Sequence, residues 1–100
     1  MQARFHPAAR AELMDAATYY EEQADELGGQ FIDEVHRVVD LLVESPSLGA
    51  ALESQPRLRR WRLRRFPYYV IYHVQANRLF ILAVAHERRR PGYWSERTRG

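Results

Sequence analysis

The 100-residue chain contains no cysteine and no lysine, so all fifteen of its Lys/Arg positions are arginine. Without cysteine it can form no disulfide bond, thiolate nucleophile or cysteine-ligated zinc site. Three of its histidines, His6, His36 and His73, are scattered without the spacing of metal ligands, and no glycine-rich phosphate loop is present. We therefore expect neither a metal nor a cofactor.

Long apolar runs are also missing. The longest, from Leu79 to Ala85, has the length of a strand and falls far short of the ~20 residues that span a membrane. The first seven residues lack the apolar region of a secretory signal. We expect a cytoplasmic protein without membrane association. A chain of this length supports one hydrophobic core, so we predict a single domain over residues 1–94 and a flexible C-terminal tail over 95–100.

The charges are divided unevenly along the chain. Residues 1–55 contain three arginines and eleven acidic residues, whereas residues 56–100 contain twelve arginines and only Glu87 and Glu96 as acids. A basic half beside an acidic half suggests a surface for nucleic acid or for an acidic partner. The alternative is that the two halves attract each other when the chain folds.

The first half of the sequence predicts a short strand followed by two helices. Residues 2–5 are expected to form the strand, and Pro7 suits the first turn of a helix, where its missing N–H costs nothing. Apolar residues then recur at three- and four-residue steps, which predicts two amphipathic helices. Gly28-Gly29 predicts the turn between them, and Pro46 predicts the end of the second helix near Ser45. The two stripes consist of Ala9, Leu13, Ala16, Ala17, Tyr20 and Ala24, and of Phe31, Val35, Val38, Val39 and Leu42.

After a loop, the second half changes to the periodicity of strands. Residues 59–65 alternate, and Tyr68–Val74 and Leu79–His86 are rich in β-branched and aromatic side chains. Residues 75–78 predict a hairpin turn, because Asn77 tolerates a left-handed conformation. The last two strands do not alternate cleanly, so we expect both of their faces to be at least partly covered. The predicted order is β-α-α-β-β-β, an α+β fold in which a short N-terminal strand and an antiparallel helix hairpin pack on a small antiparallel sheet.

Arg60, Arg62 and Arg64 fall on one face of the first strand of this second half. Same-face neighbours along a strand lie about 6.5–7 Å apart, close to the spacing of phosphates in a nucleic-acid strand. The row is therefore a candidate binding surface, and the alternative is a solvated strand face whose charge prevents aggregation. Arg59 and Arg65 fall on the opposite face.

The segment from His86 to Trp94 carries the second group of candidate residues. Its run of three arginines, residues 88–90, could hold a phosphate. Tyr93 or Trp94 could stack on a base, and His86 could transfer a proton near neutral pH. The alternatives are that His86 is satisfied by hydrogen bonds at the strand end and that Trp94 packs the tail onto the domain.

Several short motifs occur along the chain in a distinctive order. They include His6-Pro7-Ala8-Ala9 and Tyr19-Tyr20-Glu21 in the helical half, then Arg65-Phe66-Pro67-Tyr68-Tyr69-Val70-Ile71-Tyr72 and Ile81-Leu82-Ala83-Val84-Ala85-His86. Together, over roughly residues 4–94, they resemble toxins of the RelE/ParE superfamily from type II toxin–antitoxin systems, and they resemble ParE more than RelE. The resemblance implies a cytoplasmic toxin neutralised by an antitoxin that is acidic where it meets the arginines. It also implies that the toxin reaches operator DNA only through the antitoxin complex.

The resemblance implies two alternative targets. ParE-like members poison DNA gyrase, which is our first hypothesis, whereas RelE-like members cleave mRNA in the ribosome. In the second case Arg64, Arg65, Arg88 and Tyr93 would be catalytic, with His86 as a further candidate, although the absence of lysine departs from the nuclease pattern. A third hypothesis is a non-toxic member that binds only its antitoxin and operator DNA. The residues expected to bind the target or nucleic acid are Arg60, Arg62, Arg64, Arg88, Arg89, Arg90 and Trp94.

Overall fold

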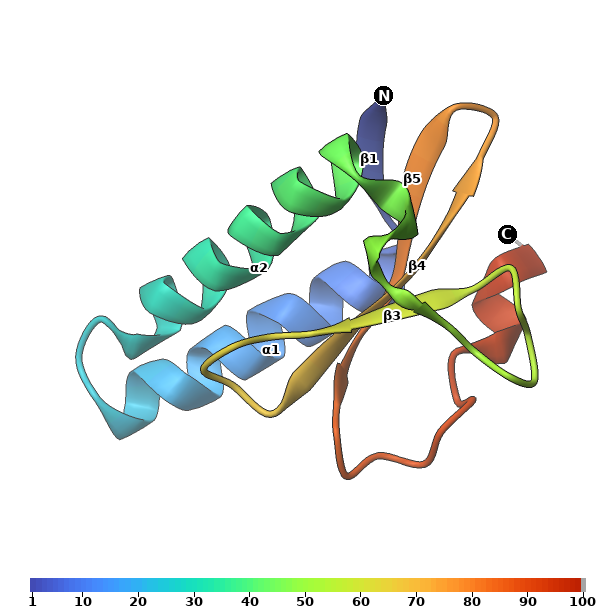
Figure 1. The fold of residues 1–100 in the computed structure, drawn as a ribbon. Coiled ribbons are helices and arrows are strands. Elements are labelled where there is room, and N and C mark those ends of the chain that lie inside the picture. Colours follow the sequence, from blue (N-terminus) through green and yellow to red (C-terminus); the bar gives the residue numbers. More distant parts are fainter. Residues whose placement is uncertain (100) are drawn as a thin grey trace.

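The computed structural model describes residues 1–99, in which a pair of helices covers one face of a twisted sheet (Figure 1). The helices are α1 (Pro7–Gln23) and α2 (Leu27–Glu44), and the strands are β1 (Gln2–Phe5), β2 (Ala50–Ala51), β3 (Arg59–Arg62), β4 (Tyr68–Gln75) and β5 (Arg78–His86). Two short 3-10 helices, η1 (Pro46–Leu48) and η2 (Ser95–Arg99), complete the order. Neither α1 nor α2, nor any other helix within residues 1–99, has the length and apolar content to cross a membrane.

The strands form one sheet in the order β1-β5-β4-β3-β2. The α+β class and the order β-α-α-β-β-β are confirmed. In two details the sheet differs from the expectation: β1 pairs in parallel with β5, with Phe5 opposite Ile81, and the two-residue β2 pairs outside β3. The sheet is therefore mixed. Neither the direction nor the pairing partner of so short an edge strand is encoded in side-chain alternation, so periodicity could not predict them.

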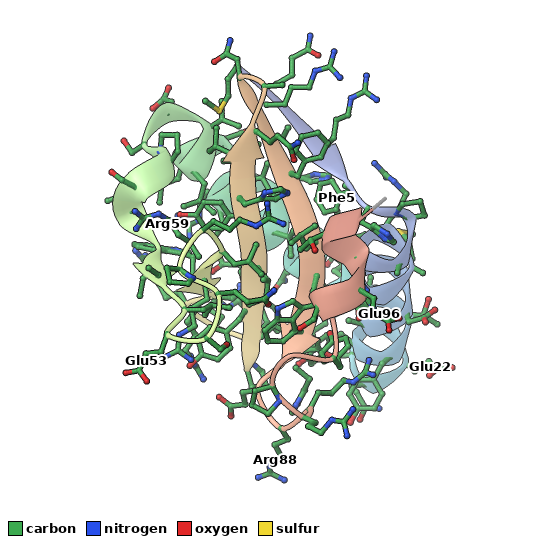
Figure 2. The ribbon with its side chains drawn as sticks, turned by 90° about the vertical axis from the view of Figure 1, so that its right-hand side faces the viewer. Phe5, Glu22, Glu53, Arg59, Arg88 and Glu96 are labelled. Carbon is green, nitrogen blue, oxygen red and sulfur yellow. The ribbon has the colours of Figure 1, made fainter. Side chains whose placement is uncertain are left out.

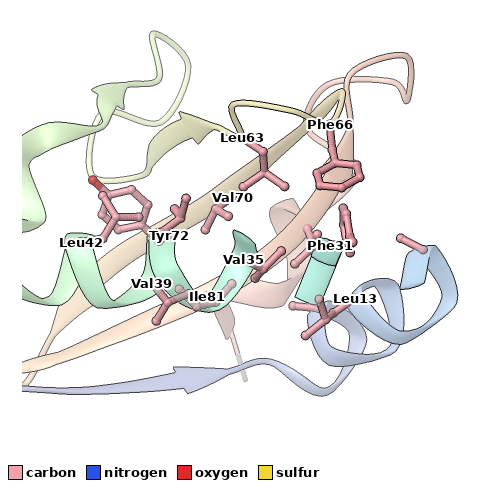
Figure 3. Packing of buried hydrophobic residues seen from close by; sticks show 14 of the residues in the cluster. Leu13, Phe31, Val35, Val39, Leu42, Leu63, Phe66, Val70, Tyr72 and Ile81 are labelled. Atoms are coloured by element: carbon pink, nitrogen blue, oxygen red, sulfur yellow. The ribbon is translucent and has the colours of Figure 1, made fainter. Parts of the chain in front are cut away.

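The main core lies between the helix pair and the inner face of the sheet (Figure 3). Leu13 of α1 and the α2 residues Phe31 and Val35 pack toward Val70 of β4 and Ile81 of β5, and each of these side chains is at most 2% exposed. Full burial of such a side chain contributes about 1.5–3 kcal/mol relative to exposure. The apolar stripes predicted from the sequence are thus the faces that hold the helices on the sheet.

Aromatic rings close one end of this core. The Phe66 ring lies 4.9 Å from that of Tyr20 and 5.0 Å from that of Phe31, and Tyr68 lies 5.0 Å from Phe31. Edge-on and tilted contacts at these distances are favourable beyond the area they bury. They hold the loop between β3 and β4 against the helix hairpin, which fixes the backbone that carries Arg64 and Arg65.

The turn between the helices differs from the one predicted. It consists of residues 24–26, with Glu26 in a left-handed conformation (φ 70°), and Gly28 belongs to the first turn of α2. The Glu21 carboxylate accepts hydrogen bonds from the backbone N–H groups of Glu26 and Gly28, both at 3.0 Å. Gly28 lies so close to α1 that an added Cβ would meet the carbonyl oxygen of Ala17 at 2.4 Å. Here glycine serves close packing of two helices rather than the turn itself.

The outer face of the sheet, away from the helices, is also partly covered, as the irregular alternation of β4 and β5 predicted. Ile71 of β4 and Ala85 of β5 form a second cluster with Leu58 and Trp94, none of them more than 7% exposed. The covering chain comes from the loop before β3 and from the segment after β5 (Figure 2). This second layer provides the walls of the candidate site.

Two local expectations concern the turn after β4 and the C-terminal tail. Asn77 adopts the expected left-handed conformation (φ 57°), and Ala76 does so as well (φ 51°). Residues 95–99, expected to be flexible, form η2, in which Arg97 bonds to the carbonyl oxygen of Leu82 at 2.9 Å; Gly100 lies outside the described residues. The division of the chain at residue 94 stays a prediction.

Because α1 and α2 approach each other closely at Gly28, substitution of Gly28 and of its neighbour Gly29 should affect stability differently. We expect Gly28→Ala to lower the free energy of unfolding by about 1–3 kcal/mol, because its Cβ would collide with the backbone of α1. Gly29 has no atom within 4 Å of an added Cβ, so Gly29→Ala should be neutral or stabilise by up to about 1 kcal/mol through helix propensity. Urea unfolding of both variants tests this, and equal effects would contradict the packing role of Gly28.

Candidate functional site

Two arginines of β3 lie on the exposed outer face, as predicted. Arg60 stacks over the Tyr69 ring, 5.1 Å from its centroid, and Arg62 forms an ion pair with Glu87 at 3.0 Å. Arg64 lies beyond the end of β3, where its backbone N–H donates to the Glu34 carboxylate at 2.8 Å. The predicted row of three arginines thus consists of Arg60 and Arg62 only, because the strand ends at Arg62. The backbone of Arg64 is bonded to α2 instead.

The remaining arginines of the β3–β4 loop and of the segment after β5 occupy different places. Arg65 donates to the side-chain carbonyl of Gln30 at 2.8 Å, so it faces the helix layer. Arg88 and Arg90 are exposed, and Arg88 projects at the tip of the segment after β5 (Figure 2). Arg89 lies over the Tyr93 ring, 3.8 Å from its centroid.

Glu12 of α1 anchors the segment that follows β5. Its carboxylate accepts hydrogen bonds from the Val84 N–H (3.0 Å), the Tyr93 hydroxyl (2.8 Å) and two nitrogens of Arg97 (2.9 and 3.0 Å). The side chain is only 15% exposed. The periodicity of the sequence places Glu12 off the apolar stripe of α1, where acidic side chains are expected to face solvent. The sequence therefore did not indicate that Glu12 anchors another segment.

The contacts of Tyr93 define its protonation state. Burial, followed by the hydrogen bond to Glu12 and the charge of that carboxylate, raises the Tyr93 pKa well above its usual value, and the nearby Arg89 and Arg97 only partly oppose this. The hydroxyl therefore stays protonated at neutral pH and acts as a donor. A protonated phenol that is already bonded to a carboxylate cannot serve as a general base.

Trp94 is buried rather than presented at the surface. It is 7% exposed, and its ring lies edge-on to Tyr93 at 5.1 Å. Its indole N–H is buried without a hydrogen-bond partner among the described residues. This burial argues against the predicted stacking of Trp94 on a base, because both faces of the ring would have to leave the second core cluster.

A cavity of about 550 Å³ opens between the loop that follows β2 and the segment that follows β5. We call it the arginine groove. Arg60 and Arg89 line it together with His86 and the acidic residues Glu53 and Glu87. Its floor includes Ile71, and the Trp94 side chain forms part of its wall. Four of the predicted residues, Arg60, Arg89, His86 and Trp94, thus meet in one place, whereas Arg62, Arg64, Arg65, Arg88, Arg90 and Tyr93 do not line it.

The residues named for the nuclease hypothesis are held by different partners. Arg64 and Arg65 are bonded to α2, Tyr93 is bonded to α1, and Arg88 projects into solvent. Within residues 1–99 no hydrogen bond or ion pair joins any two of these four. The Nδ1 atom of His86 accepts the backbone N–H of Arg88 at 3.0 Å, which leaves only Nε2 for chemistry. Among the same residues, no three His, Asp or Glu side chains are arranged to hold a metal ion.

The chain is thus a small α+β domain with a helix hairpin on one sheet face and, on the other, a groove lined by arginines and glutamates. The sequence matches, over residues 3–91, the family described as the ParE toxin of the type II toxin–antitoxin system parDE. The chain therefore belongs to the ParE toxin family, which confirms the resemblance inferred from its motifs.

Among solved structures, the chain is similar to one described as "Chromosomal ParDE TA system from P. aeruginosa", with a TM-score of 0.75 and 20% sequence identity. The match covers 86% of this chain and 95% of that chain, and at this identity it concerns the fold. No curated protein sequence matches the chain significantly.

The anchoring role of Glu12 can be tested by removing its charge. We expect Glu12→Gln to lower the free energy of unfolding by about 2–4 kcal/mol, because Arg97 and Tyr93 lose a charged acceptor in a partly buried place. Amide hydrogen exchange should accelerate first at residues 93–97. Asp15→Asn is the matched control, since it removes one exposed charge from the same helix. Unchanged protection of residues 93–97 in Glu12→Gln would contradict the anchor.

Glu34 predicts a pH-dependent contribution to stability. Burial raises the pKa of Glu34, but the Arg64 N–H and the Arg37 side chain together lower it by more, so the net shift is downward from 4.5. A carboxyl with a depressed folded pKa stabilises the fold above its unfolded pKa, and this contribution is lost as the pH falls through the folded value. We expect Glu34→Gln to cost about 1–2 kcal/mol at pH 7 and progressively less below about pH 4.5. Denaturant unfolding across pH, with exposed Asp33→Asn as control, measures the difference; a cost independent of pH would refute it.

Proposed function

We propose that this ParE-family chain inhibits bacterial growth by binding DNA gyrase through the arginine groove and the adjoining exposed arginines. We further propose that an acidic antitoxin neutralises it by covering the same surface. The observation that carries the proposal is the pair Arg60 and Arg89, which line the arginine groove over a floor that includes Ile71.

Both guanidinium groups can donate to an acidic acceptor, and a charge-assisted hydrogen bond of this kind contributes about 1.5–3 kcal/mol. The acceptor would enter between Arg60 and Arg89, over a floor that includes Ile71. Such a lining favours a protein segment that combines a carboxylate or carbonyl oxygen with an apolar side chain.

The distribution of charge supports a protein partner of acidic character. The arginines that remain exposed on this side, including Arg60, Arg88 and Arg90, have no ion pair within residues 1–99. Acidic residues of the chain are concentrated on the helix layer, which covers the opposite face of the sheet. An approaching acidic surface would therefore be steered to these exposed arginines rather than to the helices.

The state of Tyr93 favours gyrase binding over mRNA cleavage. Arginine cannot accept a proton at neutral pH, and Tyr93 is a protonated donor tied to Glu12. His86 has one nitrogen engaged by the Arg88 backbone. The described residues thus supply positive charge for binding but no prepared general base, which is the chemistry of a binding inhibitor.

A supercoiling assay with purified gyrase tests the proposal. The chain should inhibit supercoiling, and the double variant Arg60→Ala/Arg88→Ala should require at least about tenfold more protein, since charge-assisted contacts contribute about 1.5–3 kcal/mol each. Arg10→Ala, which removes one exposed arginine from the helix layer, is the control. Addition of the cognate antitoxin should restore supercoiling.

Expression of the chain alone separates the alternatives. Growth arrest with a DNA-damage response and intact transcripts supports gyrase binding. Codon-phased cleavage of mRNA on ribosomes with unaffected supercoiling would overturn it in favour of the nuclease hypothesis. Normal growth at good soluble expression would overturn both and leave a member that binds only its antitoxin.

A further inference from the structure

A second cleft lies on the outer face of the sheet, at the opposite end of β5 from the arginine groove. It has a volume of about 440 Å³ and is bounded by β1, the β4–β5 hairpin and η2 (Figure 2). Its base includes Phe80 and Leu82 of β5, whereas the arginine groove is reached from Ala85 and His86 at the other end of the strand. The two cavities share no lining residue.

All the charged side chains that line this cleft are cations: Arg4 of β1, Arg78 of β5 and Arg97 of η2. Arg4 and Arg78 are exposed and form no ion pair within residues 1–99. Arg97 makes three hydrogen bonds, to Glu12 and to the Leu82 carbonyl, so two of its five N–H groups remain for another acceptor. Three arginines thus line one cavity, and none of the described residues that line it is acidic.

His73 adds a largely buried imidazole to the lining of the cleft. The side chain is 6% exposed and lines the cleft beside Phe80, with the two rings 5.5 Å apart. Neither ring nitrogen forms a hydrogen bond with another described residue. Burial, assisted by the charge of Arg57, lowers the His73 pKa, so the imidazole is neutral at pH 7 and offers one N–H donor.

The amino end of α1 contributes further positive potential. His6 and Pro7, the first residues at that end, also line the cleft. The Nδ1 atom of His6 accepts the Ala8 N–H at 3.0 Å, which places the imidazole proton on Nε2 as another donor. The partial positive charge of the helix terminus has the same sign as the arginines.

We propose that this cleft is a binding site for a phosphate group. A phosphate supplies several acceptor oxygens and up to two negative charges, which matches guanidinium and imidazole donors that approach from different elements. The cavity is larger than a single phosphate, and the Phe80 ring offers a surface for a group attached to it. The phosphate can come from a nucleic-acid backbone or from a small phosphorylated molecule, because both present the same chemistry to the arginines.

The test is a titration of the full ¹⁵N-labelled chain with sodium phosphate at constant ionic strength, balanced with sodium chloride. Saturable shifts should be confined to His73, Arg78, Thr98 and their neighbours. The double variant Arg4→Ala/Arg78→Ala should weaken binding at least about tenfold. Arg90→Ala, which removes one exposed arginine that does not line the cleft, should leave it unchanged.

The His73 ring gives an independent readout. A bound anion should raise the pKa of His73, because its charge offsets that of the surrounding cations. These are Arg57 and Arg59 on the β3 side and the three arginines of the cleft. The exposed His36 on α2 serves as the internal reference. An unchanged His73 pKa at saturating phosphate would overturn the proposal.

A second arm uses a single-stranded oligonucleotide of about ten nucleotides, within the usual range of site sizes. Tighter binding that the double variant also weakens identifies a nucleic-acid backbone as the source. Binding of phosphate without a gain from the oligonucleotide identifies a small phosphorylated ligand. The site is refuted if neither saturates, if shifts spread equally over residues 60–62 and 88–90, or if the double variant binds normally. The milder Arg78→Gln keeps the test valid if the double variant loses its fold by circular dichroism.

Discussion

The outer face of this protein depends on one carboxylate. Glu12 receives donors from three parts of the chain, namely the backbone of β5, the Tyr93 hydroxyl and the Arg97 guanidinium. These bonds connect the helix layer through the edge of the sheet to the segment that packs on the other side. The same contacts hold Tyr93, the neighbour of Trp94, and Arg97, which lines the second cleft. A charged group with few water contacts is expensive to place there, and its four bonds offset that cost.

The division of charge along the sequence becomes a division between the two faces of the sheet. The acidic first half forms the helix layer, and most of the basic second half forms β3, β4, β5 and the segment after β5. The two halves also meet in a few pairs, such as Glu34 with the Arg64 backbone and Glu12 with Arg97. The uneven charge was explained above either by a binding surface or by attraction between the two halves of the chain. Both explanations apply, since a few arginines pair internally while others form no ion pair among the described residues. This separation leaves exposed arginines such as Arg60, Arg88 and Arg90 on the side of the sheet away from the helix layer.

Much of the fold could be predicted from the spacing of apolar residues and turn residues along the sequence. The apolar stripes of α1 and α2, the end of α2 before Pro46 and the hairpin at Asn77 all depend on neighbours within a few residues. The parallel direction of β1, the packing role of Gly28 and the anchor at Glu12 depend on distant residues instead. Glu12 and Arg97 are 85 positions apart, and no local pattern distinguishes such a glutamate from a solvated one.

The candidate site shows the same limit to what local sequence patterns can predict. The sequence identified its arginines by type and density. The structure brings Arg60 and Arg89 to one groove, whereas the Arg64 backbone and the Arg65 side chain bond to α2. The sequence could not identify the unpaired N–H of Trp94, because satisfaction of a donor depends on every neighbour in three dimensions.

The distance of 85 positions between Glu12 and Arg97 also has a consequence for the order of folding. The helix hairpin and the β4–β5 hairpin are held by local contacts, which form early because little chain entropy is lost in closing short loops. The anchor at Glu12 can close only when the sheet and α1 are already assembled. We therefore expect the segment after β5, which forms part of the arginine groove, to be the last part of the fold to assemble.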